Sequence, residues 1–61
     1  MEQKEANWEK IGEYFNLYHK YKFDSIKAGV EGKEKDAEKL MKKSRYYQTR
    51  HDNLFHKVIS A

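Results

Sequence analysis

The stretch Ala28-Gly29-Val30-Glu31-Gly32 is the only segment that can interrupt the helical pattern between two long periodic segments, and it decides the fold. Gly29 can adopt the left-handed conformation that ends a helix, and Val30 can supply the apolar contact that often follows such a cap. Gly32 can then open the next segment. Since the chain contains no proline, no residue forces a break elsewhere. We therefore expect the chain to fold back on itself near Glu31.

The segments on both sides of this turn carry residues at helical spacing. Positions three and four apart share one face of an α-helix. The first ladder is Trp8, Ile11, Phe15, Tyr18, Lys22 and Ser25, and the second is Ala37, Leu40, Ser44, Tyr47, His51, Leu54 and Val58. Folding back pairs Trp8 with Leu54, Ile11 with His51, Phe15 with Tyr47 and Tyr18 with Ser44. The sequence predicts one all-α domain over 1–61, an antiparallel hairpin with helices at about 5–28 and 33–59 and a turn at 29–32.

Two features of the first helix leave alternatives open. Asp24-Ser25 has the composition of a helix N-cap, and a break there would give three helices instead of two. Gly12 lowers helix stability by about 1 kcal/mol relative to alanine, but its small size also lets another helix approach closely. We find no alternating strand pattern, repeat or low-complexity segment.

The apolar residues outnumber those that one hairpin can cover. Tyr14 and Tyr21 border the first ladder, and further apolar residues widen both faces. These are Leu17, Phe23, Ile26, Val30, Met41, Phe55 and Ile59. A large uncovered apolar face usually marks an interface, and a 61-residue chain without cysteine needs association to gain stability. We expect a homodimer in which two hairpins form a four-helix bundle; the alternative is a monomer that docks on a target.

The charge is uneven along the chain, whose net charge is +3. Basic and acidic residues balance up to Val30, and the excess of basic residues lies in the second half, which favours anionic partners. In the folded-back chain, the acidic start of the first helix, with Glu2, Glu5, Glu9 and Glu13, lies beside Arg50 and Lys57. We find neither a signal-peptide core nor an apolar run of membrane-spanning length. A soluble cytoplasmic protein without a membrane partner is the expectation.

The residues that could carry chemistry do not converge. Ser44 and His51 lie two helical turns apart, roughly 10 Å along the axis, which is too far for a nucleophile and its base. His51 and His56 are five positions apart and therefore on different faces, unlike the spacing of four found in helical zinc sites. We interpret His51 as a half-buried seam residue, hydrogen-bonded to Tyr14 or Tyr18. We expect neither an enzyme nor a metal site, and neither a cofactor nor a small-molecule substrate.

Two binding functions remain. The first is a small interaction protein that binds and modulates a larger protein as an inhibitor or adaptor, a role that such chains also take in viruses. Its predicted contacts are Trp8, Tyr14, Tyr18, Tyr21 and Phe55, because large aromatic side chains anchor interfaces. The alternative is a helical dimer that binds nucleic acid with weak sequence specificity through the basic side of the second helix. Its predicted contacts are Lys35, Lys39, Lys42, Lys43, Arg45, Tyr46 and Arg50.

Overall fold

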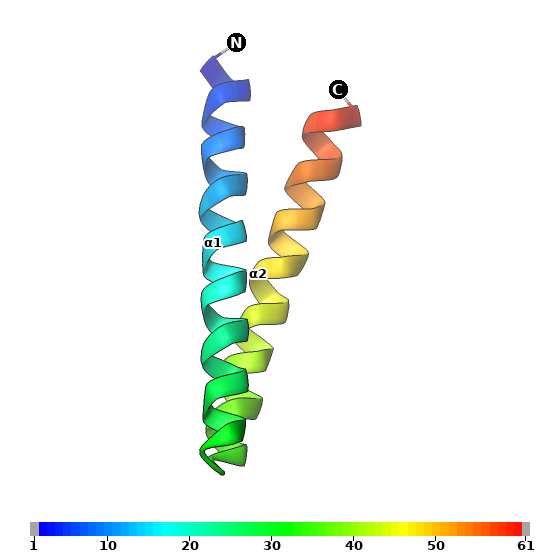
Figure 1. Cartoon of the computed structure of the whole chain (residues 1–61). Helices are drawn as coiled ribbons and strands as arrows, with labels where there is room; N and C mark the ends of the chain where they lie inside the picture. Colours follow the sequence, from blue (N-terminus) through cyan, green and yellow to red (C-terminus); the bar gives the residue numbers. More distant parts are fainter. Residues whose placement is uncertain (1, 61) are drawn as a thin grey trace.

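The computed structural model describes the backbone of residues 2–60 and the side chains of residues 7–60. Two helices, α1 (Glu2–Val30) and α2 (Glu34–Ser60), run antiparallel and pack against each other as a rod of 47 × 14 × 11 Å (Figure 1). The predicted all-α hairpin is therefore confirmed. Compared with the predicted ranges, α1 begins earlier and ends two residues later, and α2 is shifted by one residue at each end.

The turn differs in detail from the prediction. Gly32 has a φ of +81°, whereas Gly29 lies inside α1. The N–H of Lys33 donates to the carbonyl of Ala28 at 2.8 Å, and that of Gly32 donates to the carbonyl of Gly29 at 3.1 Å. This pair of bonds is a Schellman motif with Gly32 as the left-handed residue. The prediction that Gly29 ends the helix was wrong, and Val30 is 84% exposed, so it makes no capping contact.

The alternative of a third helix is also wrong. Helix α1 runs without a break through Asp24 and Ser25. The Ser25 hydroxyl does not cap a new helix, because it donates across the seam to the carbonyl of Ala37 at 2.7 Å. A second bond of the same kind joins the Ser44 hydroxyl to the carbonyl of Tyr18 at 3.0 Å. These two bonds fix the register of the helices, and the second confirms the predicted pairing of Tyr18 with Ser44.

The ladder of α2 is confirmed, since every one of its seven residues is buried or half-buried. The ladder of α1 was only half right. Ile11, Tyr18 and Ser25 lie in the seam, but Trp8 and Phe15 are 44% and 48% exposed, and Lys22 is exposed as well. The other seam positions of α1 are occupied instead by Tyr14 and Tyr21, which are half-buried, and by Ala28, which is buried. A seam through Phe15 would also have buried the ammonium group of Lys22, which is costly without a partner.

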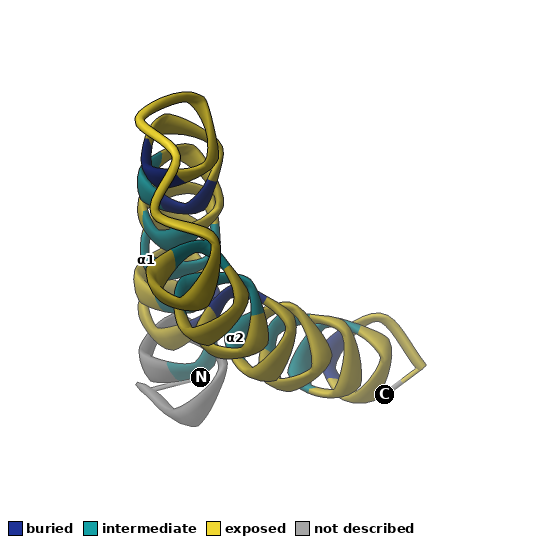
Figure 2. Ribbon diagram, turned by 90° about the horizontal axis from the view of Figure 1, so that it is seen from below, coloured by how far each residue is buried: buried dark blue, intermediate teal, exposed yellow. Residues whose placement is uncertain are grey.

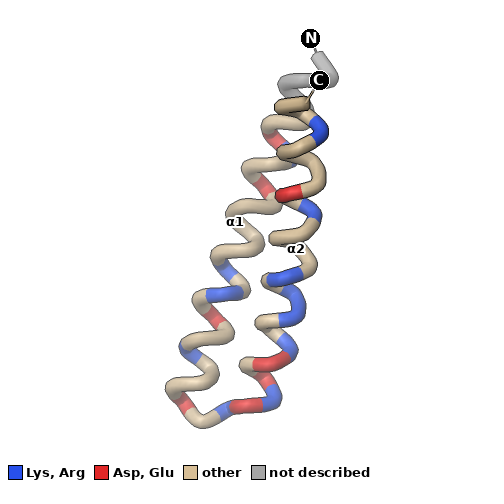
Figure 3. The backbone as a smooth tube through the Cα atoms, turned by 90° about the vertical axis from the view of Figure 1, so that its right-hand side faces the viewer, with Lys and Arg blue, Asp and Glu red and all other residues tan. Residues whose placement is uncertain are grey.

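The seam residues of both helices repeat every seven positions, and the helices accordingly wind around each other. The two ribbons separate near the chain ends and overlap near the turn in Figure 1, and the reverse holds in Figure 3. Most of both ribbons is exposed, as Figure 2 shows. The buried apolar side chains of the described region are Ile11, Ala28 and Val58 alone, so the hairpin has a very small core. Neither helix, over the residues described, has a stretch apolar enough to span a membrane.

Candidate functional site

A layer of two helices has two broad faces, and in this hairpin their chemistry differs. The apolar face carries Trp8, Phe15, Ile26, Met41, Phe55 and Ile59, and the same spacing places the polar residues Lys22 and Gln48 among them. The tyrosine–cation face carries Lys10, Tyr14, Tyr21, Lys43, Tyr46, Tyr47, Arg50 and Lys57. The assignment follows from heptad spacing on either side of the seam and from the ring contacts described below. Phe23 and Val30, which are also exposed, lie on the outer edge of α1.

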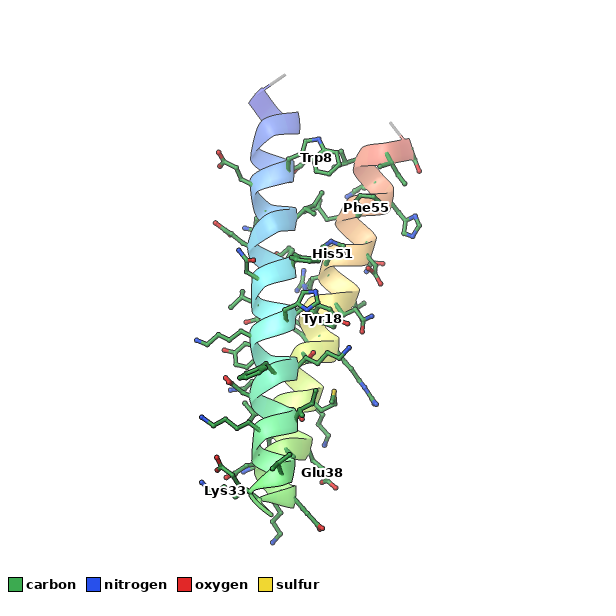
Figure 4. The ribbon with its side chains drawn as sticks, in the orientation of Figure 1. Trp8, Tyr18, Lys33, Glu38, His51 and Phe55 are labelled. Atoms are coloured by element: carbon green, nitrogen blue, oxygen red, sulfur yellow. The ribbon has the colours of Figure 1, made fainter. Side chains whose placement is uncertain are left out.

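The apolar face is widest near the chain ends. The rings of Trp8 and Phe55 meet edge to face, with centroids 6.0 Å apart. The ring of His51 stacks on that of Phe55 with centroids 5.9 Å apart, and its centroid lies 5.9 Å from that of Phe15. Trp8, Phe55 and His51 follow one another along this edge of the hairpin in Figure 4. Trp8, Phe15, Ile26 and Ile59 remain between 44% and 55% exposed. The face is thus an uncovered patch of large side chains from both helices.

Stacked tyrosines close the opposite side of the seam. The ring of Tyr47 lies between Tyr21, at a centroid distance of 5.7 Å and an interplanar angle of 8°, and Tyr14, at 6.2 Å and 29°. Tyr46 meets Tyr47 edge to face at 5.2 Å. Phenol rings bury their carbons and keep their hydroxyl groups near water, which suits this boundary position.

Cations cover the exposed surfaces of these rings. The guanidinium of Arg50 donates two hydrogen bonds to the Tyr46 hydroxyl, from Nε at 3.1 Å and from Nη2 at 2.9 Å. It also lies over the Tyr46 ring, 5.1 Å from the centroid, and Lys43 Nζ lies 5.5 Å from the centroid of Tyr21. The hydrogen bonds that Arg50 donates to the Tyr46 hydroxyl raise the pKa of Arg50 above its ordinary value. The tyrosines therefore hold these cations in fixed positions.

The cations of this face have no carboxylate partners among the described side chains. The two ion pairs of residues 7–60 join Lys33 to Glu31 at 3.4 Å and His51 to Asp52 at 3.0 Å. Glu9 and Glu13, which we expected beside Arg50 and Lys57, form no ion pair there. Glu2 and Glu5, which we expected there too, lie outside the described side chains. Basic residues follow one another along α2 in Figure 3. Among the described residues, this positive charge is thus not neutralised by ion pairs, which favours binding of external anions.

Shallow hollows lie on the tyrosine–cation face at each end of the hairpin, and another, of about 360 Å³, is lined by Arg45, Tyr46, Thr49, Arg50 and Asn53. The open-end hollow, between the free ends of the helices, encloses about 300 Å³. Its lining residues are Asn7, Lys10, Tyr14, Arg50, Leu54 and Lys57. The turn-end hollow encloses about 480 Å³. Its lining residues are Asp24, Lys27, Ala28, Glu31, Lys33, Asp36, Lys39, Leu40 and Lys43.

The structure divides the predicted protein-binding residues among three places. Trp8 and Phe55 touch each other on the apolar face. Tyr14 and Tyr21 belong to the opposite face, where both contact Tyr47. Tyr18 lies in the seam, with its carbonyl bonded to Ser44. They do not form a single surface.

The predicted nucleic-acid contacts are also divided. Lys43, Tyr46 and Arg50 meet the tyrosine cluster, and Lys39 lines the turn-end hollow beside it. Arg45 lines a hollow together with Tyr46 and Arg50. Lys35 and Lys42 are exposed on the side of α2 that faces away from this cluster. Sequence reasoning did not include Lys10, Lys57 or Tyr47 in any site. The signal that could have found Lys57 is heptad spacing, because positions 43, 50 and 57 are seven apart.

The histidines show no metal-binding arrangement. His51 is half-buried as predicted, but its Nδ1 lies 3.0 Å from Asp52 Oδ1 and not beside Tyr14 or Tyr18 hydroxyls. Within the described residues, no group of three potential ligands is placed to hold a metal ion. Comparisons of the chain with protein-family models, curated proteins and solved structures give no match.

Proposed function

We propose that this chain is a small helical interaction protein that works as a homodimer and binds and modulates a larger protein. The apolar face takes the second copy, and the tyrosine–cation face is left for the partner. The observation that carries the proposal is the presence of two unlike faces on a hairpin whose core is too small for the apolar surface it carries.

The area of the chain supports the dimer. A compact monomer of 7.4 kDa exposes about 4200 Å², whereas this chain exposes 5177 Å². The excess of roughly 1000 Å² is comparable to what one partner buries in a standard protein–protein interface, about 800 Å². Pairing the apolar faces of two copies about a two-fold axis covers this area and leaves no further apolar face exposed for growth. The product is a four-helix bundle.

The chemistry of the opposite face supports a protein partner. Tyrosine and arginine are enriched at the centres of protein interfaces, where they combine a large contact area with fixed hydrogen bonds. Tyr46 and Arg50 offer this combination, and their mutual contacts reduce the entropy lost on binding. The cations without carboxylate partners favour an acidic surface on the partner. In this assignment, Trp8 and Phe55 belong to the dimer interface and Tyr14 and Tyr21 to the partner interface.

Nucleic-acid binding is the second candidate, favoured by the cations that lack carboxylate partners. Its weakness lies in the aromatic rings. Tyr14, Tyr21 and Tyr47 stack on one another, and cations lie over Tyr21 and Tyr46, so little ring surface is free to stack on bases. Such binding would depend on phosphate contacts alone and would weaken steeply with salt.

The dimer is tested by sedimentation equilibrium. We expect twice the mass of one chain for the wild type and a monomer for Ile59→Glu, whose charge cannot be buried between two copies. Thr49→Glu places the same charge on the outer side of α2 and should leave the mass unchanged. A wild-type monomer at all concentrations contradicts the dimer, as does a dimer that Ile59→Glu leaves intact.

The partner is tested by affinity capture from lysate with and without nuclease treatment, using two double variants. Replacing Lys43 and Lys57 with glutamine removes two charges from the tyrosine–cation face. Replacing Lys35 and Lys42 with glutamine removes two charges from the opposite side of α2. We expect the first variant alone to lose a discrete protein that survives nuclease and moderate salt. Material released by nuclease, or equal loss in both variants, supports the nucleic-acid candidate instead.

A further inference from the structure

Among the side chains that the structure describes, the open-end hollow combines three positive charges with no negative one. Lys10 comes from α1, and Arg50 and Lys57 come from α2, so the hollow bridges the two helices. The other lining residues are Asn7, Tyr14 and Leu54, which add polar groups and an apolar side chain but no carboxylate. Like charges gathered around one hollow repel one another, and an anion bound between them removes that repulsion.

The turn-end hollow on the same face provides an internal comparison. It is lined by four lysines and three carboxylates, so its charges nearly cancel. The hairpin therefore does not simply carry lysine everywhere on this face. The open-end hollow, in contrast, is lined by three cations and by no carboxylate among the described side chains. The hollow beside Tyr46 has two cations, Arg45 and Arg50, and likewise no described carboxylate.

One of the three cations is oriented by the protein itself. The Nε and Nη2 atoms of Arg50 are both bonded to the Tyr46 hydroxyl, which leaves Nη1 free to donate to a ligand. A guanidinium fixed in this way binds the oxygens of a tetrahedral anion with little further loss of freedom. The lysines then supply mobile point charges on either side of it.

We propose that the open-end hollow is a binding site for a phosphate monoester. Three cations around one compact hollow match a group that carries close to two negative charges, as a monoester does at neutral pH. A nucleic-acid backbone spreads single charges along its length instead, and most of its phosphates would lie beyond the hollow. Leu54 and the ring of Tyr14 favour an ester with an apolar substituent. The site goes beyond the proposed function, because it requires neither the dimer nor the larger partner.

The test is an NMR titration of the full chain, labelled with ¹⁵N, with phenyl phosphate as the probe. We expect saturable shifts at the amides of Asn7 and Leu54 and at the Nε–H of Arg50. Residues that line the turn-end hollow should not shift. Inorganic phosphate should bind at the same place but more weakly, since it lacks the apolar substituent.

Matched variants decide whether the three cations carry the binding. Lys57→Gln and Arg50→Gln should each lower the affinity for phenyl phosphate by about fivefold or more. This is the factor that corresponds to roughly 1 kcal/mol of lost attraction. Lys27→Gln, which removes one lysine from the turn-end hollow, should change the affinity less than twofold. Lys57→Gln alters an exposed side chain and tests the site even if Arg50→Gln disturbs Tyr46. Unchanged affinity in Lys57→Gln, or equal binding of the diester dimethyl phosphate, overturns the proposal.

Discussion

The half of the hairpin near the turn and the half near the chain ends are joined by different interactions. Near the turn and at mid-length, small side chains occupy the seam, and the hydroxyls of Ser25 and Ser44 donate to carbonyls of the facing helix. Near the chain ends, the rings of Trp8, Phe55 and His51 contact one another along the edge of the seam and stay partly exposed.

This difference gives the two halves different roles: one sets the alignment of the two helices, and the other offers an exposed surface. Directional hydrogen bonds between backbone and small side chains allow one alignment of the helices, because a slip of one turn breaks both bonds at once. Aromatic contacts are less directional and tolerate small shifts, but they leave large rings available to a partner. The turn half therefore defines the fold, and the open half supplies the binding surface.

The largest effect on the free energy of unfolding is expected from a larger side chain at the most deeply buried position of the seam. Ser44 is 1% exposed, so Ser44→Leu forces a larger side chain into a space with no room for it. We expect the free energy of unfolding to fall by about 3 kcal/mol, as measured by urea denaturation at one protein concentration. The control Thr49→Leu places the same side chain on an exposed site of α2. Equal effects of the two variants would mean that the seam is looser at Ser44 than the structure indicates.

A smaller effect is expected at the turn itself. An alanine at Gly32 must adopt a φ of +81°, although the space around its Cβ is open. Gly32→Ala should therefore lower the free energy of unfolding by about 1.5 kcal/mol, the cost of the left-handed conformation. Gly29→Ala is the control with the opposite expected effect, because Gly29 is helical and a Cβ added there also meets open space. It should raise thermal stability, and a loss there would assign the left-handed position to Gly29.

The smallest effect on folding is expected in the open half. Trp8→Ala removes the edge-to-face contact with Phe55, worth about 1 kcal/mol beyond area burial. Amide hydrogen exchange should accelerate near Trp8 and Phe55 and stay slow near Tyr18 and Ser44. Uniform acceleration along both helices would show that the two halves open together and would remove the distinction between them.

The sequence predicted the hairpin, the ladder of α2 and the pairing of Tyr18 with Ser44. These follow from helical spacing, which the tertiary structure preserves. It did not predict which of two adjacent ladders of α1 enters the seam, because Ile11, Tyr18 and Ser25 belong to both. The choice between Phe15 with Lys22 and Tyr14 with Tyr21 depends on the cost of burying a charge, which a count of apolar positions does not include.

The binding sites were harder to predict, for a related reason. Charge patches were sought along single helices, whereas the open-end hollow combines Lys10 of α1 with Arg50 and Lys57 of α2. Their proximity depends on the register that Ser25 and Ser44 set. The turn was misassigned because either glycine could adopt a positive φ, and only the hydrogen bonds from Gly32 and Lys33 distinguish them.

The two interhelical serine bonds also bear on how this sequence can diverge. In each bond, the donor is a side chain and the acceptor is a backbone carbonyl, from Ala37 or Tyr18. Substitution at an acceptor position leaves its carbonyl in place, whereas substitution at a donor position removes the bond. Natural variants of this hairpin should therefore retain a small hydroxyl residue at positions 25 and 44 while the side chain at position 18 varies.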